Sequence, residues 1–157
     1  MSDKPLVIFL GNSIMKDDRI GLELGHRLRN ELIGKGFDVE ILERSGLGLI
    51  DYLEGRRLVI VVDSVVTNKY PTGSVLKLKV EDFKVCKGFS PHYAGLPEAI
   101  ELMKSLKLDV PKVYVIAVEV RDPYTPSMEL TKELEDKLSD ITLEVKEKIL
   151  EISDQLN

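Results

Sequence analysis

Acidic side chains and a histidine stand at three places where folding could bring them together to do chemistry. Asp17 and Asp18 end a glycine-started loop that follows the first apolar run of the chain. Asp63 directly follows the strongest apolar run, residues 58–62, and His92 lies in an irregular stretch before a helical pattern. Two carboxylate oxygens and one imidazole nitrogen suit a divalent transition-metal ion with open coordination positions. They do not suit a structural zinc site, which normally uses four Cys or His ligands.

Each of these residues also has a reading in which it does no chemistry. Asp17 and Asp18 could stabilise the start of the following helix, since carboxylates interact favourably with the N-terminal end of the helix dipole. His92 taken alone is more typical of an ordinary loop histidine. Asp63 is harder to explain in this way, because a charged residue at the end of a fully apolar strand points to a functional site.

Other reactive side chains offer weaker candidates. His26 falls on the polar side of the first predicted helix, so we expect it to be solvated. Cys86 has no basic neighbour in the sequence, which favours an incidental thiol over a nucleophile. The GxSxG, HExxH and glycine-rich phosphate-binding motifs are absent. The sequence therefore offers carboxylate and histidine chemistry rather than an activated serine or cysteine.

Composition narrows the classes of protein to consider. With 157 residues the chain is most simply one domain, 1–157. A net charge of −5 without a basic cluster argues against a nucleic-acid partner. The apolar runs are shorter than the about 20 residues that span a bilayer, so we expect no membrane insertion. A single cysteine and no visible signal peptide favour a cytoplasmic location.

The pattern of apolar residues predicts the elements that must position the candidate side chains. Strands are predicted at residues 6–10, 39–42, 58–62, 75–80 and 113–118, and the fourth is expected at a sheet edge. Helices are predicted at residues 19–33, 49–54 and 96–106, with a last one whose N-cap is Thr131. Strands that alternate with helices indicate an α/β fold with three layers and a doubly wound, mostly parallel sheet.

This topology predicts where a ligand would bind. Open α/β sheets place their ligand sites at the carboxyl edge of the strands. In a flavodoxin-type strand order the first and third strands are neighbours. We therefore expect Asp63 to lie close to Asp17 or Asp18, and the loop that carries His92 could return to the same edge. Gly25, within the first helix, is expected to permit close packing of that helix onto the sheet.

The order of these motifs resembles the hydrogenase maturation endopeptidases of the HycI and HybD type. The resemblance comprises Gly11-Asn12 with Asp17-Asp18 and Gly21, a strand that ends on Asp63, and the segment SPHYAGL at 90–96. It runs from the first strand to the final helix. The fold it implies is a five-stranded twisted sheet between helices. The activity it implies is removal of the C-terminal extension from the large-subunit precursor of a [NiFe] hydrogenase, after nickel insertion.

The resemblance also implies roles for individual residues. The metal-contacting positions of the family correspond to Asp18, Asp63 and His92, which would complete the coordination of nickel supplied by the precursor. Gly48 and Gly95 are expected to contact the substrate. The nucleophile is expected to be a water. Either the ion activates the reaction directly or it only positions the tail while a carboxylate such as Asp17 acts as general base.

The chain departs from the family pattern at several glycines. Phe9 stands where a second glycine is common, and the segment at 45–48 retains only Gly48 of a GTxG pattern. Residues 117–120 replace a glycine and proline that often follow the fifth strand. These differences touch none of the three expected metal contacts. They bear on loop shape and on the choice of precursor.

Two alternative functions fit parts of the same pattern. A receiver-like phosphoacceptor or regulatory metal-binding domain also has paired acids after its first strand and an aspartate at the end of its third. Thr67 would then be a hydroxyl near Asp63, but Glu119 follows the last strand where a receiver requires a lysine. Stable phosphorylation of Asp63 by a small phosphodonor with magnesium would favour this alternative. The second alternative is a member of the same family that binds the tail of a metalloprotein without cutting it.

Overall fold

The sheet is mostly parallel, and its first and third strands are neighbours, as the sequence predicts. The computed structural model describes residues 3–43, 46–80 and 96–156. Its strands are β1 Leu6–Leu10, β2 Asp38–Leu42, β3 Leu58–Val65, β4 Val75–Lys79 and β5 Lys112–Glu119. They form one sheet in the order β2-β1-β3-β5-β4, in which only the edge strand β4 is antiparallel to its neighbour. The predicted neighbours β1 and β3 are paired.

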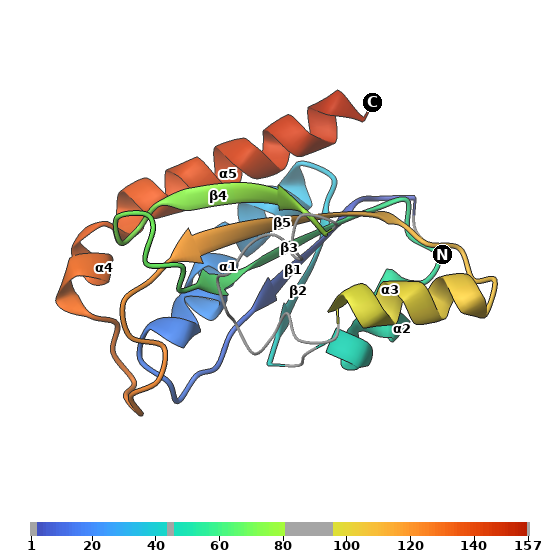
Figure 1. Ribbon diagram of the computed structural model, residues 1–157. Coiled ribbons are helices and arrows are strands. Elements are labelled where there is room, and N and C mark those ends of the chain that lie inside the picture. The colour runs from blue at the N-terminus through green and yellow to red at the C-terminus, as the bar shows by residue number, and fades with distance from the viewer. Residues whose placement is uncertain (1–2, 44–45, 81–95, 157) are drawn as a thin grey trace.

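Helices cover both faces of this sheet (Figure 1). They are η1 Asp17–Arg19, α1 Ile20–Gly34, η2 Gly46–Leu49, α2 Ile50–Leu53, α3 Leu96–Ser105, α4 Lys132–Asp136 and α5 Leu138–Gln155. α1 and α5 lie on one face, and α2 and α3 lie on the other. The prediction of a three-layer α/β fold is confirmed. Among the described residues, no helix combines the length and apolarity needed to cross a membrane.

Alternation along the strands builds a separate core on each face. In β1, Val7 and Phe9 pack in the core under α1 and α5, whereas Leu6, Ile8 and Leu10 pack in the core under α2 and α3. All five residues of β1 are buried, as expected for a strand covered on both faces. The predicted helical stripes are buried as well. They comprise Ile20, Leu24, Leu28 and Leu32 in α1 and Leu138, Ile141, Val145 and Ile149 in α5.

The sequence prediction was wrong about the end of β3. The strand does not stop before Asp63 but continues through Ser64 to Val65, and all eight residues are buried. Its last three residues pair with the final residues of β5, up to Glu119. Polar residues are tolerated inside this strand because the Asp63 carboxylate accepts a hydrogen bond from the Ser64 amide.

The last helix was also predicted as one element, whereas the chain forms α4 and α5. The break lies at Lys137, whose backbone has φ −95° and ψ −1°. The Lys137 amide donates to the Leu134 carbonyl at 3.2 Å, a tight i→i+3 turn. The Lys137 ammonium reaches the Thr72 carbonyl at 2.9 Å. Periodicity alone does not reveal such a break, because the apolar stripe continues across it.

Close contact between α1 and β1 depends on Gly21. A Cβ built on Gly21 would lie 1.8 Å from the Leu10 carbonyl oxygen, which belongs to the backbone and cannot rotate away. Gly25, as predicted, also packs closely, since its Cβ would lie 3.0 Å from the Cβ of Phe9. We therefore expect Gly21→Ala to lower the free energy of unfolding by about 1–3 kcal/mol, the usual cost of overpacking.

Urea denaturation of Gly21→Ala and Gly34→Ala measures this effect. Gly34 ends the same helix, and its Cβ would meet no atom within 4 Å. The control Gly34→Ala should therefore be neutral or slightly stabilising. Equal unfolding free energies for the two variants would contradict the role given to Gly21.

Candidate functional site

Buried polar side chains gather at the carboxyl edge of the sheet. In Figure 1 the arrowheads of the parallel strands point toward the side of the molecule that carries α4. Within the described ranges, the buried polar and charged side chains are Asp17, Asp18, Asp63, Ser64, Thr72 and Glu119. All six lie in the ends of β3 and β5 or in the loops and turns at this edge. Because burial of polar groups costs free energy, their concentration at one edge indicates a functional site.

Two of these carboxylates meet at one serine. Asp18 is 3 % exposed, and its Oδ1 accepts a hydrogen bond from Ser64 Oγ at 2.7 Å. Asp63 is fully buried, and its Oδ1 accepts a hydrogen bond from the Ser64 amide at 2.6 Å. Asp18 lies in η1 and Asp63 in β3, far apart in the sequence. The fold therefore brings Asp18 into contact with the residue that follows Asp63.

The end of β1 explains why the Ser64 amide is available to a carboxylate. β1 pairs with β3 as far as Phe9 and Val62. The next residue of β3 to bond β5 is Val65, whose carbonyl accepts from the Val120 amide at 3.0 Å. Successive residues of a strand alternate the neighbour to which they bond. The Ser64 amide therefore faces the space beyond β1, where the Asp63 carboxylate satisfies it.

Asp17 has a different environment from its neighbour Asp18. Its carboxylate accepts from the amides of Arg121, Asp122 and Thr131 at 3.2, 2.8 and 2.8 Å, and from the Thr131 hydroxyl at 3.2 Å. Its own amide donates to the Asp122 carbonyl at 2.8 Å. Of the four donors, three reach Oδ2 and one reaches Oδ1, so both oxygens of the carboxylate are engaged. The arrangement favours fastening of the loop before α4 over the general-base role that the sequence suggested for Asp17.

The side chain of Thr131 contributes to this fastening. It occupies the N-cap position of α4 with φ −58° and ψ 149°, as predicted. Its side chain makes no capping hydrogen bond, however, because the hydroxyl is directed to Asp17. The predicted N-cap position of Thr131 is thus confirmed.

Glu119 forms a second buried anchor at the end of β5. It is 2 % exposed, and its carboxylate accepts from the hydroxyl and the amide of Thr67 and from the Asn68 amide. These bonds hold the turn that follows β3, where Asn68 adopts a φ of 59°. Thr67 was considered from the sequence as a hydroxyl near Asp63 in a receiver-like site. Its hydroxyl instead bonds Glu119.

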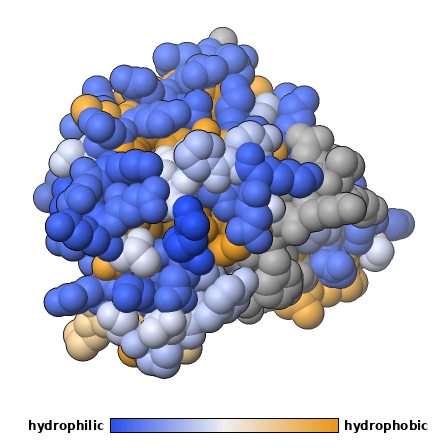
Figure 2. Space-filling model, turned by 60° about the vertical axis from the view of Figure 1, so that its left-hand side comes forward, coloured by the Kyte–Doolittle hydropathy of each residue, from blue (hydrophilic) through white to orange (hydrophobic). Residues whose placement is uncertain are grey.

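Two loops pair along the rim of this edge. The Lys16 amide donates to the Thr125 carbonyl at 2.8 Å, and the Ser127 amide donates to the Ile14 carbonyl at 3.0 Å. Met15 and Pro126 form an isolated antiparallel bridge between them. The face that this side of the molecule presents is mostly hydrophilic, with small separate hydrophobic areas (Figure 2). Exposed apolar side chains on the paired loops are Ile14 at 61 %, Tyr124 at 64 % and Met128 at 78 %.

Asp122 stabilises the turn of the second loop. Its carboxylate accepts from the Thr125 hydroxyl at 2.6 Å and from the Tyr124 and Thr125 amides at 3.0 Å. The Thr125 hydroxyl contributes most to holding the pKa of Asp122 below its ordinary value, and the amides and Lys16 add to this effect. Because the pKa is lowered in the folded state, the turn is stabilised above about pH 4, where a free aspartate is ionised. This stabilisation is lost as the pH falls through the lowered pKa.

We therefore expect Thr125→Val to raise the pKa of Asp122 toward its ordinary value. A ¹³C NMR titration of the Asp122 carboxyl group in the two proteins measures the change. An identical midpoint in both proteins would show that the hydroxyl does not hold the carboxylate in its charged form.

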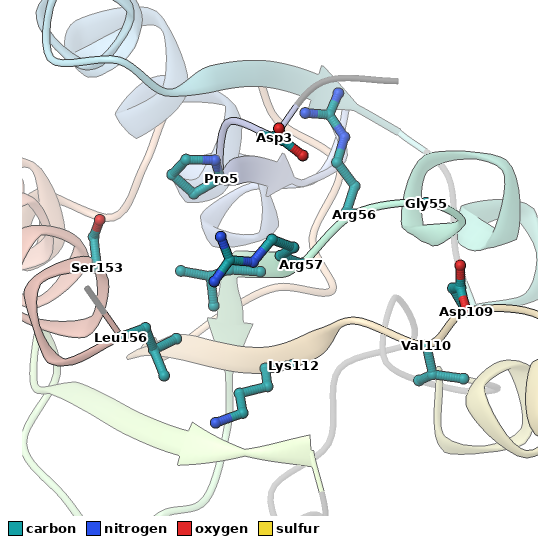
Figure 3. A pocket seen from close by; sticks show the side chains of 11 residues that line it. Asp3, Pro5, Gly55, Arg56, Arg57, Asp109, Val110, Lys112, Ser153 and Leu156 are labelled. Atoms are coloured by element: carbon teal, nitrogen blue, oxygen red, sulfur yellow. The ribbon is translucent and has the colours of Figure 1, made fainter.

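A cavity of about 500 Å³ lies at the opposite edge of the sheet (Figure 3). It is lined by residues at the amino ends of β3 and β5, including Leu58 and Lys112, and by the end of α5. Arg57, Lys112 and Ser153 surround it. Sheets of this class bind ligands at the carboxyl edge. We do not assign this cavity to the candidate site.

The remaining predicted site residues divide into two groups. Gly48 is exposed in η2, in the connection that leaves the carboxyl end of β2. His92 and Gly95, and also Cys86, lie outside the described residues. Within the described ranges, no three His, Cys, Asp or Glu side chains form a cluster that could hold a metal ion. His26 is exposed on α1, as predicted.

Sequence reasoning missed Ser64 and Glu119 as parts of this edge. Ser64 follows Asp63 and precedes Val65, so a polar residue inside a continuing apolar pattern was the available signal. Glu119 was considered only as a departure from a receiver pattern. Its position directly after the apolar run 113–118 could have identified it, because the same kind of position singled out Asp63.

The sequence matches a known family over most of its length. The HycI family model, described as "Hydrogenase maturation protease", matches residues 23–148. This range includes Asp63 and begins after Asp18. The "Hydrogenase 2 maturation protease" of Escherichia coli K12 is 25 % identical over 134 residues, which cover 83 % of this chain and 80 % of that protein.

Solved structures share the fold. The hydrogenase maturating endopeptidase HybD from E. coli superposes with a TM-score of 0.73 at 22 % identity, covering 94 % of this chain and 93 % of that one. The [NiFe] hydrogenase maturation protease HybD from Thermococcus kodakarensis gives a TM-score of 0.72 at 24 % identity, covering 93 % and 98 %. At these identities the structural likeness establishes the fold, and the family match carries the assignment.

Proposed function

This chain belongs to the hydrogenase maturation protease family, and we propose that it removes the C-terminal extension of a [NiFe] hydrogenase large-subunit precursor. In this proposal the precursor brings nickel, and Asp18 and Asp63 contact that metal when the precursor docks. The observation that carries the proposal is the convergence of two buried carboxylates on Ser64 at the carboxyl edge.

The chemistry of the donors supports a metal-bearing substrate. Carboxylate oxygens bind divalent first-row metals, and neutral imidazole suits nickel among them. His92, the third contact implied by the family resemblance, would add the nitrogen ligand. Three ligands leave coordination positions for groups of the precursor. A site completed only by the precursor's own ligands would discriminate loaded from unloaded precursor.

The surroundings of the carboxylates support a protein substrate. The rim beside Asp18 is formed by the two paired loops, and their exposed apolar side chains include Ile14 and Met128. Backbone pairing and the Asp17 anchor hold these loops in place before any substrate arrives. A preorganised rim lowers the entropy cost of docking a partner protein.

Hydrolysis of the tail requires addition of water across one peptide bond. The water oxygen attacks the scissile carbonyl, and its proton is transferred to the leaving amine. When a divalent ion is present it can polarise the carbonyl or lower the pKa of the water. The contribution of this chain is to position the loaded precursor through Asp18, Asp63 and His92. The donors around Asp17 make it a poor candidate for the base.

Mass spectrometry of a large-subunit precursor incubated with this protein tests the proposal. We expect one mass decrease that corresponds to a defined C-terminal peptide, and no cleavage of the already processed subunit. Formation of a stable complex without any mass change would instead favour a protein that binds the tail without cutting it. Stable incorporation of phosphate at Asp63 would favour the receiver-like alternative.

A further inference from the structure

We propose that Ser64 is a positioning residue that sets the geometry of Asp18 relative to Asp63. The inference rests on the proposed function, because it concerns the two carboxylates assigned there to the precursor's nickel. Ser64 is 2 % exposed and lies between two residues of β3 that are themselves buried. Its role would be to orient the ligands without touching the metal.

The Ser64 hydroxyl orients Asp18. Ser64 Oγ lies 2.7 Å from Asp18 Oδ1, and a hydroxyl that donates to a carboxylate makes a stronger hydrogen bond than one between neutral groups. In this bond the hydroxyl donates, because an ionised carboxylate can only accept. Fixing Oδ1 against β3 also fixes the direction of the other carboxylate oxygen. The bond is buried, so water competes for it less than at the surface.

The backbone of the same residue orients Asp63. The Ser64 amide donates to Asp63 Oδ1 at 2.6 Å. Ser64 is held in turn by β3, which pairs with β5 in register on both sides of it, at Asp63–Ala117 and Val65–Glu119. Both carboxylates are therefore hydrogen-bonded to the same residue, and strand pairing holds that residue in place. Loops alone would position ligands less precisely than a strand does.

A purely structural role for Ser64 predicts different behaviour. A buried hydroxyl that only satisfies its own hydrogen-bonding requirement would affect the free energy of unfolding when removed. It would not affect the affinity of the site for a metal ion or the efficiency of cleavage. These readouts separate the two roles.

The test compares Ser64→Ala and Ser64→Thr with the wild type. Ser64→Ala removes the hydroxyl, and Ser64→Thr retains it on a β-branched residue that suits a strand. Thr142→Val serves as the control, since it removes a 2.7 Å hydroxyl bond to the Leu138 carbonyl within α5. For each protein we measure the unfolding midpoint in urea, the kcat/KM for tail removal from nickel-loaded precursor, and zinc binding by isothermal titration.

We expect Ser64→Ala to lower kcat/KM and the zinc affinity by about 10–100-fold, the usual loss for residues that orient metal ligands. Ser64→Thr should recover most of both, because it keeps the hydroxyl that donates to Asp18. Thr142→Val should match the wild type. Wild-type cleavage and zinc affinity in Ser64→Ala would overturn the proposal. Equal losses in Ser64→Ala and Ser64→Thr would overturn it too, because the hydroxyl would then not be the cause.

Zinc titration separates failure of this inference from failure of the proposed function. If wild-type protein cleaves no loaded precursor, the proposed function fails. The zinc-binding measurement still decides the role of Ser64. Weaker zinc binding by Ser64→Ala than by wild type then supports the inference, provided that Asp63→Asn abolishes the same binding. Equal binding by both proteins, or no binding to the wild type, overturns it.

Discussion

Asp63→Asn is expected to abolish tail removal while leaving the fold intact. The amide oxygen of asparagine can still accept the hydrogen bond from the Ser64 amide, so the end of β3 should keep its structure. The substitution removes the negative charge that would contact the precursor's metal. We expect the rate of tail removal to fall by more than about 100-fold, beyond the loss typical of residues that only orient metal ligands.

The stability of Asp63→Asn should be close to that of the wild type or higher. Asp63 is fully buried, and removal of a buried charge relieves a desolvation cost. Functional sites commonly keep residues that lower the stability of the fold, because activity requires them. Intact-mass analysis of the precursor measures activity, and urea denaturation measures stability. Asp109→Asn, an exposed acid at the opposite edge, is the control and should process the precursor normally.

Asp17→Ala is expected to cause the largest loss of stability. The substitution leaves three backbone amides and the Thr131 hydroxyl without their acceptor in a partly buried place. An unsatisfied buried donor costs about 1–3 kcal/mol, although local relaxation and water reduce the sum. We expect the free energy of unfolding to fall by about 3–5 kcal/mol, near the upper end for single substitutions.

Asp17→Asn separates this anchoring role from general-base catalysis. Both carboxylate oxygens of Asp17 accept from amides, so an asparagine NH₂ group would oppose a donor in either orientation. We therefore expect Asp17→Asn to be destabilised as well, with faster hydrogen exchange in the loop before α4. A variant of normal stability that has lost cleavage would instead identify Asp17 as the base. Asp109→Ala provides the stability control.

The parts of the fold that depend on local periodicity could be predicted from the sequence. Continuous burial of β1 and the stripe at Ile20, Leu24 and Leu28 follow from patterns of apolar residues only a few positions long. The mostly parallel sheet followed from the alternation of strands with helices, whereas the place of β4 beside β5 did not. The end of β3 could not be predicted in this way, because Asp63 and Ser64 interrupt the apolar run while pairing with β5 continues.

The site was predictable in its location and less so in the roles of its residues. The carboxyl edge follows from topology, so Asp18 and Asp63 could be placed there without coordinates. The difference between Asp17 and Asp18 could not be foreseen, since the donors to Asp17 lie at positions 121–131, more than 100 residues away. Ser64 was missed because its importance depends on a contact with Asp18, 46 residues distant.

The central claim is that this chain recognises its substrate through a metal that the substrate carries. Intact-mass spectrometry of nickel-loaded and nickel-free precursor, each incubated with the wild-type protein, tests it most directly. We expect loss of a defined C-terminal peptide from the loaded precursor and an unchanged mass for the nickel-free one. Equal cleavage of both forms would contradict it.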